Sequence, residues 1–302
     1  MTIKNILKLS QMASTTTSFF PAFIGIAYAW YNYRTFNPVL SILAVLVIVL
    51  FHMAVNIRDN YLEYEIAIKK GEHSADNIIL GEEKIRLKDI SNVYLTFGII
   101  STIIGIYLVT QTSLILLYVA IINFSIGILY TAGPRPIAST PFGEFFVGLS
   151  MGFGIFFSTV YVNAYEVIQF DFVTLVQLVI ASVPTAITVM AIMLANNIGD
   201  LEEDIEDNRF TLPYYIGVEK ALTVYQFFYY SVYASVIVSI LIGTFPKLVI
   251  FFFLAVPIIQ KNIRKVMIKH DKDTGMLASV INSFVIPVAI LIPFIIGMWF
   301  DI

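Results

Sequence analysis

The sequence predicts an all-α membrane protein that crosses the bilayer many times, and three observations support this prediction. Only 13% of the residues are charged and 58% are hydrophobic, whereas a soluble domain has about 25% charged residues. The mean hydropathy is +0.84. Uncharged runs of about 20 residues, the length that spans a bilayer as a helix, recur along the chain. Most of the surface must therefore face lipid, because there are too few polar residues to cover it.

The uncharged runs predict nine membrane-spanning helices. The run over residues 90–134 is too long for one span, and the polar patch at residues 110–113 divides it into two. The run near residue 250 is short, but it extends on both sides if its terminal Lys and Arg side chains reach toward water. The expected helices cover residues 11–31, 38–57, 91–109, 114–132, 142–162, 173–197, 219–242, 246–265 and 277–299.

The positions of the basic residues orient these helices. With a cytoplasmic N-terminus, only Arg34 and Lys247 of the 18 Lys and Arg residues fall outside, as the positive-inside rule requires. We therefore expect a multi-pass protein of the cell (inner or plasma) membrane with its C-terminus outside. Residues 1–302 would form one transmembrane domain, with cytoplasmic cap loops at about 58–90 and 198–218. Because those loops hold most of the acidic residues, function is expected at the cytoplasmic face.

Composition also excludes several classes of function. The formal net charge is −3, so there is no basic excess and nucleic acid is not an expected partner. The chain has no cysteine, which excludes disulfides, thiolate metal sites and thiol nucleophiles. Its three histidines do not have the spacing of a zinc site.

Two segments repeat the pattern Asn-Ile-x-Asp-x-x-x-acid, each starting at the cytoplasmic end of an expected helix. The repeated polar residues are Asn56, Asp59 and Glu63 in the first motif and Asn197, Asp200 and Asp204 in the second. On a helix, offsets of 0, 3 and 7 place each trio on one polar stripe. Four carboxylates facing one cavity would repel each other unless cations bind. Oxygen ligands of this kind suit Mg²⁺ bridging to phosphate, so the motifs predict a Mg²⁺–diphosphate site held by the four carboxylates. Solvated helix ends, or the ion site of a transporter built from repeats, are the alternatives.

Both motifs resemble those of the UbiA superfamily of intramembrane prenyltransferases, whose members carry two Asp-rich motifs on helices two and six of nine. Residues 130–137 and 140–144 are similar to the YTxGPRPI and TPxGE segments of the branch that prenylates 1,4-dihydroxy-2-naphthoate. Residues 196–204 and 209–212 are similar to that branch's NNxRDxxxD and RTL segments. The resemblance covers nearly the whole chain.

The resemblance implies both a fold and a reaction. The fold is a UbiA-type bundle around a central cavity open to the cytoplasmic side and to lipid. The reaction is the Mg²⁺-dependent transfer of a polyprenyl chain from polyprenyl diphosphate to an aromatic acceptor, which we expect to be 1,4-dihydroxy-2-naphthoate in menaquinone biosynthesis. Asp59, Glu63, Asp200 and Asp204 would be the catalytic and metal-binding residues.

A further set of residues is expected to bind the substrates. The Gly-Pro-Arg-Pro turn offers a guanidinium for phosphate oxygens, and a buried, hydrogen-bonded histidine is the plainer interpretation of His52, which shares the stripe of Asn56. The candidate substrate-binding residues are Asn56, Asn197, Tyr130, Arg135, Arg209 and His52.

Some residues depart from the family pattern. The first motif ends in Glu63 where relatives commonly have Asp, and Gln11-Met12 replaces an Arg-Pro pair near the first helix. Lys8 or Arg58 is the candidate to replace that missing arginine. Prenylation of 4-hydroxybenzoate or another lipid acceptor, a cation-coupled membrane transporter, and a non-catalytic scaffold remain the alternative functions.

Overall fold

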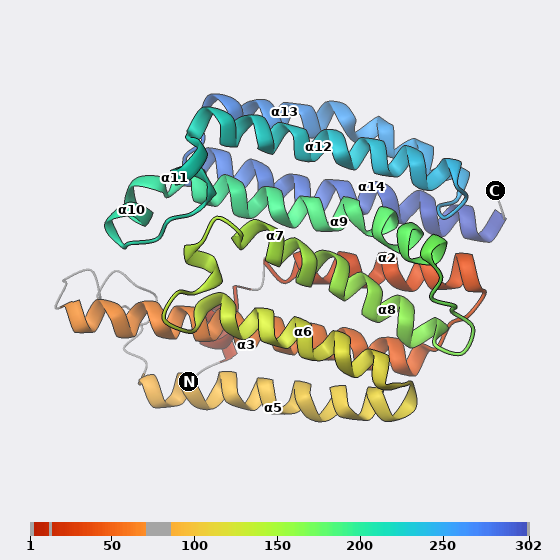
Figure 1. Cartoon of the computed structure of the whole chain (residues 1–302), viewed down its shortest axis with the longest axis horizontal. Helices are drawn as coiled ribbons and strands as arrows, with labels where there is room; N and C mark the ends of the chain where they lie inside the picture. Colours follow the sequence, from red (N-terminus) through yellow and green to blue (C-terminus); the bar gives the residue numbers. More distant parts are fainter. Residues whose placement is uncertain (1–2, 12–13, 71–85, 301–302) are drawn as a thin grey trace.

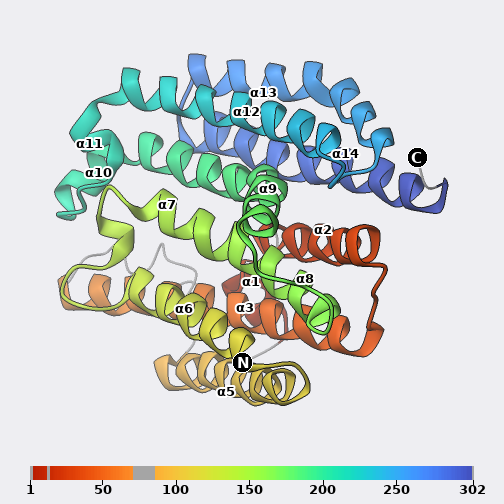
Figure 2. The ribbon, with the colours of Figure 1, turned by 45° about the vertical axis from the view of Figure 1, so that its right-hand side comes forward.

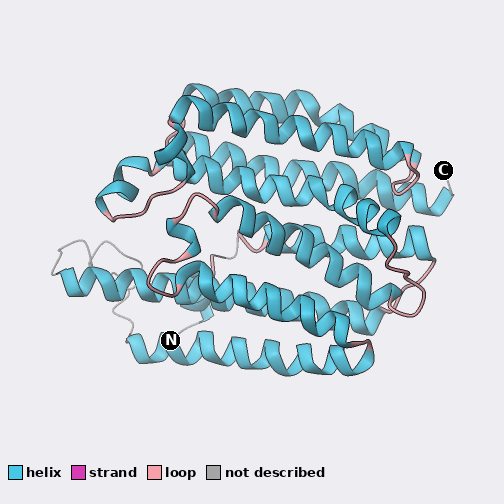
Figure 3. Ribbon diagram, in the orientation of Figure 1, coloured by secondary structure: helices cyan, strands magenta, loops and turns pink. Residues whose placement is uncertain are grey.

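The chain forms a bundle of helices that lie roughly along one axis (Figure 1), and the part described contains no strand (Figure 3). This computed structural model describes residues 3–11, 14–70 and 86–300. In chain order the elements are α1 (Ile3–Leu9), α2 (Thr16–Tyr33), α3 (Pro38–Lys70), α5 (Leu87–Gln111), α6 (Leu114–Thr131), η2 (Ile137–Ser139), α7 (Gly143–Val147), η3 (Gly148–Gly154), α8 (Ile155–Ala164), α9 (Phe172–Gly199), α10 (Leu201–Glu206), α11 (Leu212–Ile216), α12 (Val218–Leu241), η4 (Lys247–Ala255), α13 (Val256–Ile268), η5 (Lys272–Met276) and α14 (Leu277–Phe300).

Within the described residues, seven helices are long and apolar enough to cross a membrane. They are α3 up to Leu62, α5, α6, the continuous rod α7–η3–α8, α9, α12 and α14 with the end of η5. Two further expected spans are also helical, but they differ from the seven. The helix α2 has a polar start and a polar end, and the second segment is divided between the 3-10 helix η4 and the strongly amphipathic α13. The chain is therefore a multi-pass membrane protein.

The helix α3 is longer than the sequence suggested. We expected it to end near residue 57 and a loop to begin at 58, but α3 continues to Lys70. Residues 58–70 contain no Gly or Pro and include Leu, Glu, Ala and Lys, which favour helix. The first charged residues, Arg58 and Asp59, mark where α3 leaves the apolar layer of the membrane. The helix itself continues beyond that point. The first motif consequently lies inside a continuous helix.

The second motif has a different backbone. The helix α9 ends at Gly199, and Asp200 has non-helical dihedral angles before α10 begins at Leu201. Glycine has a low helix propensity, which favours a helix end here. Asn197 and Asp204 therefore belong to two separate helices, and the single stripe expected for this motif is interrupted.

Close packing fixes α9 against the rod α7–η3–α8. The π-helical segment η3 contains Gly148 and Gly152, and a Cβ atom added to Gly152 would overlap the Ala186 Cα of α9. Small residues allow helices to approach closely in a membrane, where packing replaces the hydrophobic effect as the main source of association. The second motif at the end of α9 is positioned by this contact.

Polar pairs join the last three helices of the bundle. The Tyr225 hydroxyl of α12 lies 2.7 Å from the Ser279 hydroxyl of α14. Asn262 Nδ2 of α13 donates to Asn282 Oδ1 of α14 at 2.9 Å. Asn282 Nδ2 in turn donates to the Ile259 carbonyl at 3.3 Å. Buried side chains of this kind are satisfied across helices, because lipid offers them no partner.

Candidate active site

The chain segments that carry the candidate residues meet at one end of the bundle. The ends of α6 and α9, and the part of α3 that holds the first motif, lie toward the end of the molecule where α10 and α11 are found, at the left of Figure 1; Figure 2 shows the same arrangement from another side. A backbone hydrogen bond joins two of the connecting segments, from the Phe210 amide to the Ser139 carbonyl at 3.3 Å. This end is where the structure brings chemistry-bearing side chains together.

Asp204 is the most firmly held carboxylate of the second motif. Only 3% of this residue is exposed. Arg209 Nε lies 3.3 Å from Asp204 Oδ1, and the Thr211 hydroxyl donates to Asp204 Oδ2 at 3.2 Å. The Arg209 amide also donates to the Asp204 carbonyl at 2.7 Å. The buried carboxylate of Asp204 is thus paired with the guanidinium of Arg209. That guanidinium is partly exposed, so it can also reach a ligand outside the bundle.

The two consecutive asparagines of the second motif have separate partners. Asn196 Nδ2 donates to Asp200 Oδ2 at 3.0 Å. Asn197 Nδ2 donates to Glu144 Oε1 at 2.8 Å, and both residues of this pair are buried. Asn196 therefore orients a carboxylate of its own motif, whereas Asn197 joins α9 to α7.

Glu144 is a site residue that the sequence analysis quoted but did not assign. It is 2% exposed, and its Oε2 atom has no hydrogen-bond partner within the described residues. A buried carboxylate oxygen is costly unless something satisfies it. The sequence alone could have pointed to Glu144, because it is the one charged residue between Arg135 and Glu166 in an otherwise uncharged segment.

Asp59 and Tyr130 bring the first motif and α6 into the same electrostatic neighbourhood. The Tyr130 hydroxyl interacts with the charges of Asp59, Arg209, Glu144 and Asp204, and it lies 3.8 Å from the sulfur of Met193 on α9. Asp59 also interacts with the charges of Arg58 and Arg209. Residues of α3, α6, α7 and α10 therefore surround one region, as the two-motif hypothesis requires.

Asn56 and His52 contact the start of the chain. Asn56 Nδ2 donates to the Ser10 carbonyl at 2.9 Å and to the Ser14 hydroxyl at 2.8 Å. His52 Nδ1 lies 2.5 Å from the Ser18 hydroxyl. Asn56 holds the turn between α1 and α2 against α3, and His52 holds the first turn of α2. His52 is thus half-buried and hydrogen-bonded, close to the plainer interpretation. Contact of either residue with a substrate stays a prediction.

The remaining candidates lie at the margin of the site. Arg135 is exposed in the turn after α6. Arg58 Nη1 donates to the Thr131 hydroxyl at 2.9 Å and to the Ile128 carbonyl at 3.3 Å, so it caps the end of α6. Glu63 lies on α3, but its side chain, like the whole of Met12, is outside the part of the chain that the structure describes.

The donor set is of the kind that suits Mg²⁺. Among the described residues, no three His, Asp or Glu side chains form a ready metal cage. Mg²⁺ commonly binds through one or two carboxylates and completes its shell with water and substrate phosphate oxygens. Carboxylates such as Asp59 and Asp200, together with the unsatisfied Glu144 Oε2, fit an ion that arrives with a diphosphate.

A multi-pass helical bundle with acidic, amide and arginine side chains gathered at one end has the architecture of an intramembrane transferase. Residues 18–284 match the UbiA prenyltransferase family, so this chain belongs to that family and is a prenyltransferase. The family membership expected from the two motifs is confirmed.

Individual relatives agree with this membership. The chain is 32% identical over 255 residues to 1,4-dihydroxy-2-naphthoate octaprenyltransferase of Bacillus subtilis (strain 168), which covers 83% of this chain and 78% of that protein. A UbiA homologue from Aeropyrum pernix K1 has a TM-score of 0.71 at 14% identity, over 92% of this chain and 97% of that one. A UbiA homologue from Archaeoglobus fulgidus, bound to DMAPP and Mg²⁺, has a TM-score of 0.57 at 12% identity, over 97% and 99% of the two chains. The two solved structures show that the fold is shared.

Proposed function

We propose that this prenyltransferase moves a polyprenyl chain from polyprenyl diphosphate to 1,4-dihydroxy-2-naphthoate, a step of menaquinone biosynthesis. One structural observation supports the proposal most directly: the charged groups of Asp59, Asp204 and Arg209, from both motif regions, gather near the half-buried Tyr130 at the end of α6. The acceptor is inferred from the relative in Bacillus subtilis, which is named for it. Prenylation of 4-hydroxybenzoate is the alternative within the family, and family membership speaks against the transporter and the scaffold.

Mg²⁺ is the proposed cofactor, with Asp59, Glu63, Asp200 and Asp204 as the residues that would hold it. When bound, the ion would neutralise charge on the leaving diphosphate. The Archaeoglobus fulgidus homologue binds DMAPP and Mg²⁺, which supports the pairing of a metal with a prenyl diphosphate on this fold.

The other side chains have proposed roles that follow from their positions. Arg209 and the exposed Arg135 would bind phosphate oxygens, because guanidinium groups pair well with them. Asn197, oriented by Glu144, and Asn56 would contact the bound ions or the diphosphate, and His52 the acceptor. The prenyl C1–O bond breaks and diphosphate leaves. The ring carbon that bears the carboxylate then bonds to C1, and the carboxylate leaves as CO₂, which returns its electron pair to the ring. Exclusion of water by the apolar bundle would protect the prenyl cation from hydrolysis.

We also propose the membrane arrangement. All nine helical rods would span the bilayer of the cell membrane, including α2 and η4–α13, with a cavity open to the cytoplasm and to lipid. The motif end would face the cytoplasm, since Arg34 and Lys247 alone fall on the other side. The C-terminus, which follows the last described residue Phe300, would lie outside.

Diphosphate release by the purified protein tests this function. The assay would contain geranylgeranyl diphosphate, Mg²⁺ and 1,4-dihydroxy-2-naphthoate. We expect release to require both metal and acceptor, to stop with EDTA, and to fall on the order of a hundredfold or more in Asp200→Asn. Glu219→Gln, at an exposed site on α12, is the matched control and should retain activity. Release supported by 4-hydroxybenzoate alone would retain the reaction class and refute the acceptor.

A further inference from the structure

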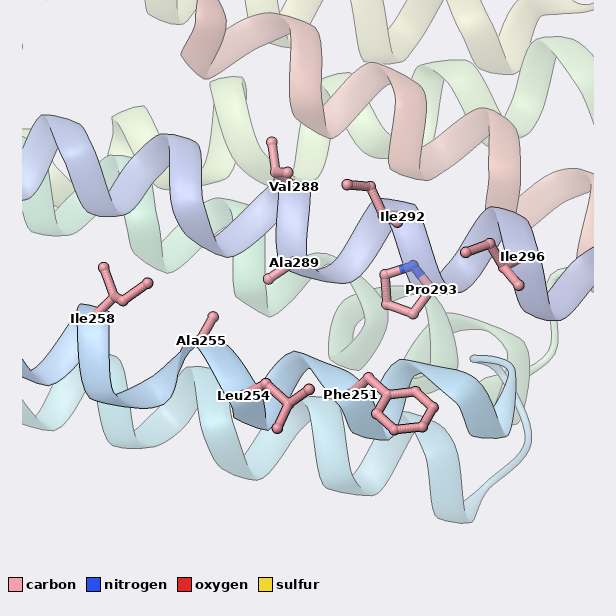
Figure 4. Close-up of a pocket in the computed structure, with 9 residues that line it drawn as sticks. All are labelled: Phe251, Leu254, Ala255, Ile258, Val288, Ala289, Ile292, Pro293 and Ile296. Atoms are coloured by element: carbon pink, nitrogen blue, oxygen red, sulfur yellow. The ribbon is translucent and has the colours of Figure 1, made fainter.

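An apolar groove lies on the outside of the bundle between η4–α13 and α14, away from the active site. Figure 4 shows it between the two helices, with Leu254 and Ile258 on one wall and Ile292 and Ile296 on the other. Its volume is about 440 Å³. The small residue Ala289 also lines it, and Leu254 is 77% exposed. In a bilayer this groove opens to the hydrocarbon layer.

A basic hollow follows the groove along the same rod. It has a volume of about 480 Å³ and is lined by Lys261, Arg264 and Lys265, together with Gln260. The three cations are exposed, and none of the ion pairs among the described residues involves them. Gln260 Nε2 donates to the Tyr233 hydroxyl of α12 at 3.2 Å, so this face of α13 is fixed to its neighbour.

The groove and the basic hollow are neighbours on the same rod, η4–α13. Pro257 lines the hollow and its neighbour Ile258 lines the groove. Ile258, Lys261 and Lys265 recur at spacings of three and four residues, which places them on one stripe of the helix. The basic end of α13 lies at the same end of the molecule as α11 (Figure 1). An apolar groove and a cluster of cations thus lie next to each other along one helix, near one end of the molecule.

We propose that this surface binds an anionic phospholipid, with an acyl chain in the groove and the phosphate in the basic hollow. Basic pockets beside membrane helices on the cytoplasmic side suit anionic headgroups, and the potential of that leaflet is already negative. The orientation rule accounts for cations at this boundary, but it gives no reason for a groove lined by Ala289 to meet them. The apolar groove matches the acyl chain of such a lipid, and the basic hollow matches its phosphate.

Native mass spectrometry of the full-length protein in detergent tests this site. The probes are phosphatidylglycerol and phosphatidylcholine with identical acyl chains. We expect wild type to retain phosphatidylglycerol in preference to phosphatidylcholine. The triple variant Lys261→Gln, Arg264→Gln, Lys265→Gln should bind phosphatidylglycerol roughly tenfold or more weakly. A matched triple variant with the same change of charge, Lys4→Gln, Lys88→Gln, Lys220→Gln, should bind it like wild type.

A second variant addresses the groove itself. Ala289→Phe would fill it from the α14 wall. We expect this variant to retain phosphatidylglycerol more weakly while the three cations stay intact. Equal retention by wild type and the Lys261 triple variant would overturn the proposal. So would displacement of the lipid by equimolar geranylgeranyl diphosphate, since the surface would then belong to the substrate. Because the readout is binding, a failure here is distinct from a failure of the proposed reaction.

Discussion

At the scale of single residues, the partner of a side chain decides what a motif residue does. Asn56 and Asn197 hold the same place in the two motifs, yet Asn56 donates to Ser10 and Ser14 whereas Asn197 donates to Glu144. The first amide stabilises the fold near the chain start, and the second connects α9 to an acidic residue of α7. The two motifs therefore repeat in sequence, but their equivalent asparagines have different hydrogen-bond partners.

Glu144 gives a test at this scale. Glu144→Gln keeps an oxygen that accepts the Asn197 amide, whereas Glu144→Ala leaves that amide buried without its partner. We expect Glu144→Ala to lower kcat/KM for prenyl transfer by about tenfold or more, the effect of one unsatisfied buried polar group. Glu144→Gln should retain more activity than Glu144→Ala. Steady-state kinetics measures both, with Glu219→Ala as a control; equal losses in the two variants would contradict the role of the hydrogen bond.

At the scale of secondary-structure elements, glycine allows α9 to lie close to η3. The Cα of Ala186 occupies the space that a side chain at Gly152 would need. This contact holds the helix whose end carries Asn197 and Asp200. Packing at the middle of the bundle therefore sets the position of the second motif.

Substituting this glycine should destabilise the protein. Gly152→Ala introduces a methyl group against backbone, which cannot yield as a flexible side chain can, and overpacking of this kind costs about 1–3 kcal/mol. A lower Tm in detergent is expected. Gly98→Ala is the matched control, since a Cβ there meets nothing within 4 Å. An unchanged Tm in Gly152→Ala would show that η3 and α9 can separate without cost.

Much of the element order could be predicted from the sequence. The length of each uncharged apolar run indicates a membrane span, and the charged residues indicate where the span ends. The expected span over 114–132 appears as α6, Leu114–Thr131, and that over 173–197 as α9, Phe172–Gly199. The end of α3 could not be predicted in this way, since Arg58 and Asp59 mark the water boundary while the helix continues. The pairing of Asn197 with Glu144 was equally hidden, because it joins residues 53 positions apart.

At the scale of the whole molecule, two exposed lysines report which end of the bundle faces the cytoplasm. Lys220 at the start of α12 and Lys247 at the start of η4 are both exposed and lie on opposite sides of the α12 span. A helix of the 24 residues of α12 is about 36 Å long, enough to separate them by a bilayer.

The absence of cysteine makes this orientation easy to measure. Single variants Lys220→Cys and Lys247→Cys each introduce the one thiol of the chain. In intact cells a membrane-impermeant maleimide should label Lys247→Cys and leave Lys220→Cys unlabelled until the membrane is opened. The reverse pattern would invert the proposed topology and place the active site outside.

The two motifs differ in how they would tolerate an inserted residue, because their backbones differ. Adding one residue between Asn56 and Asp59 would rotate everything beyond it by about 100° along the continuous helix α3. Adding one directly after Asp200 would fall at the break between α9 and α10, where the backbone already leaves the helix. We therefore expect the first motif to require a fixed count of residues, whereas an insertion at the break of the second motif would leave the Asn196–Asp200 hydrogen bond in place.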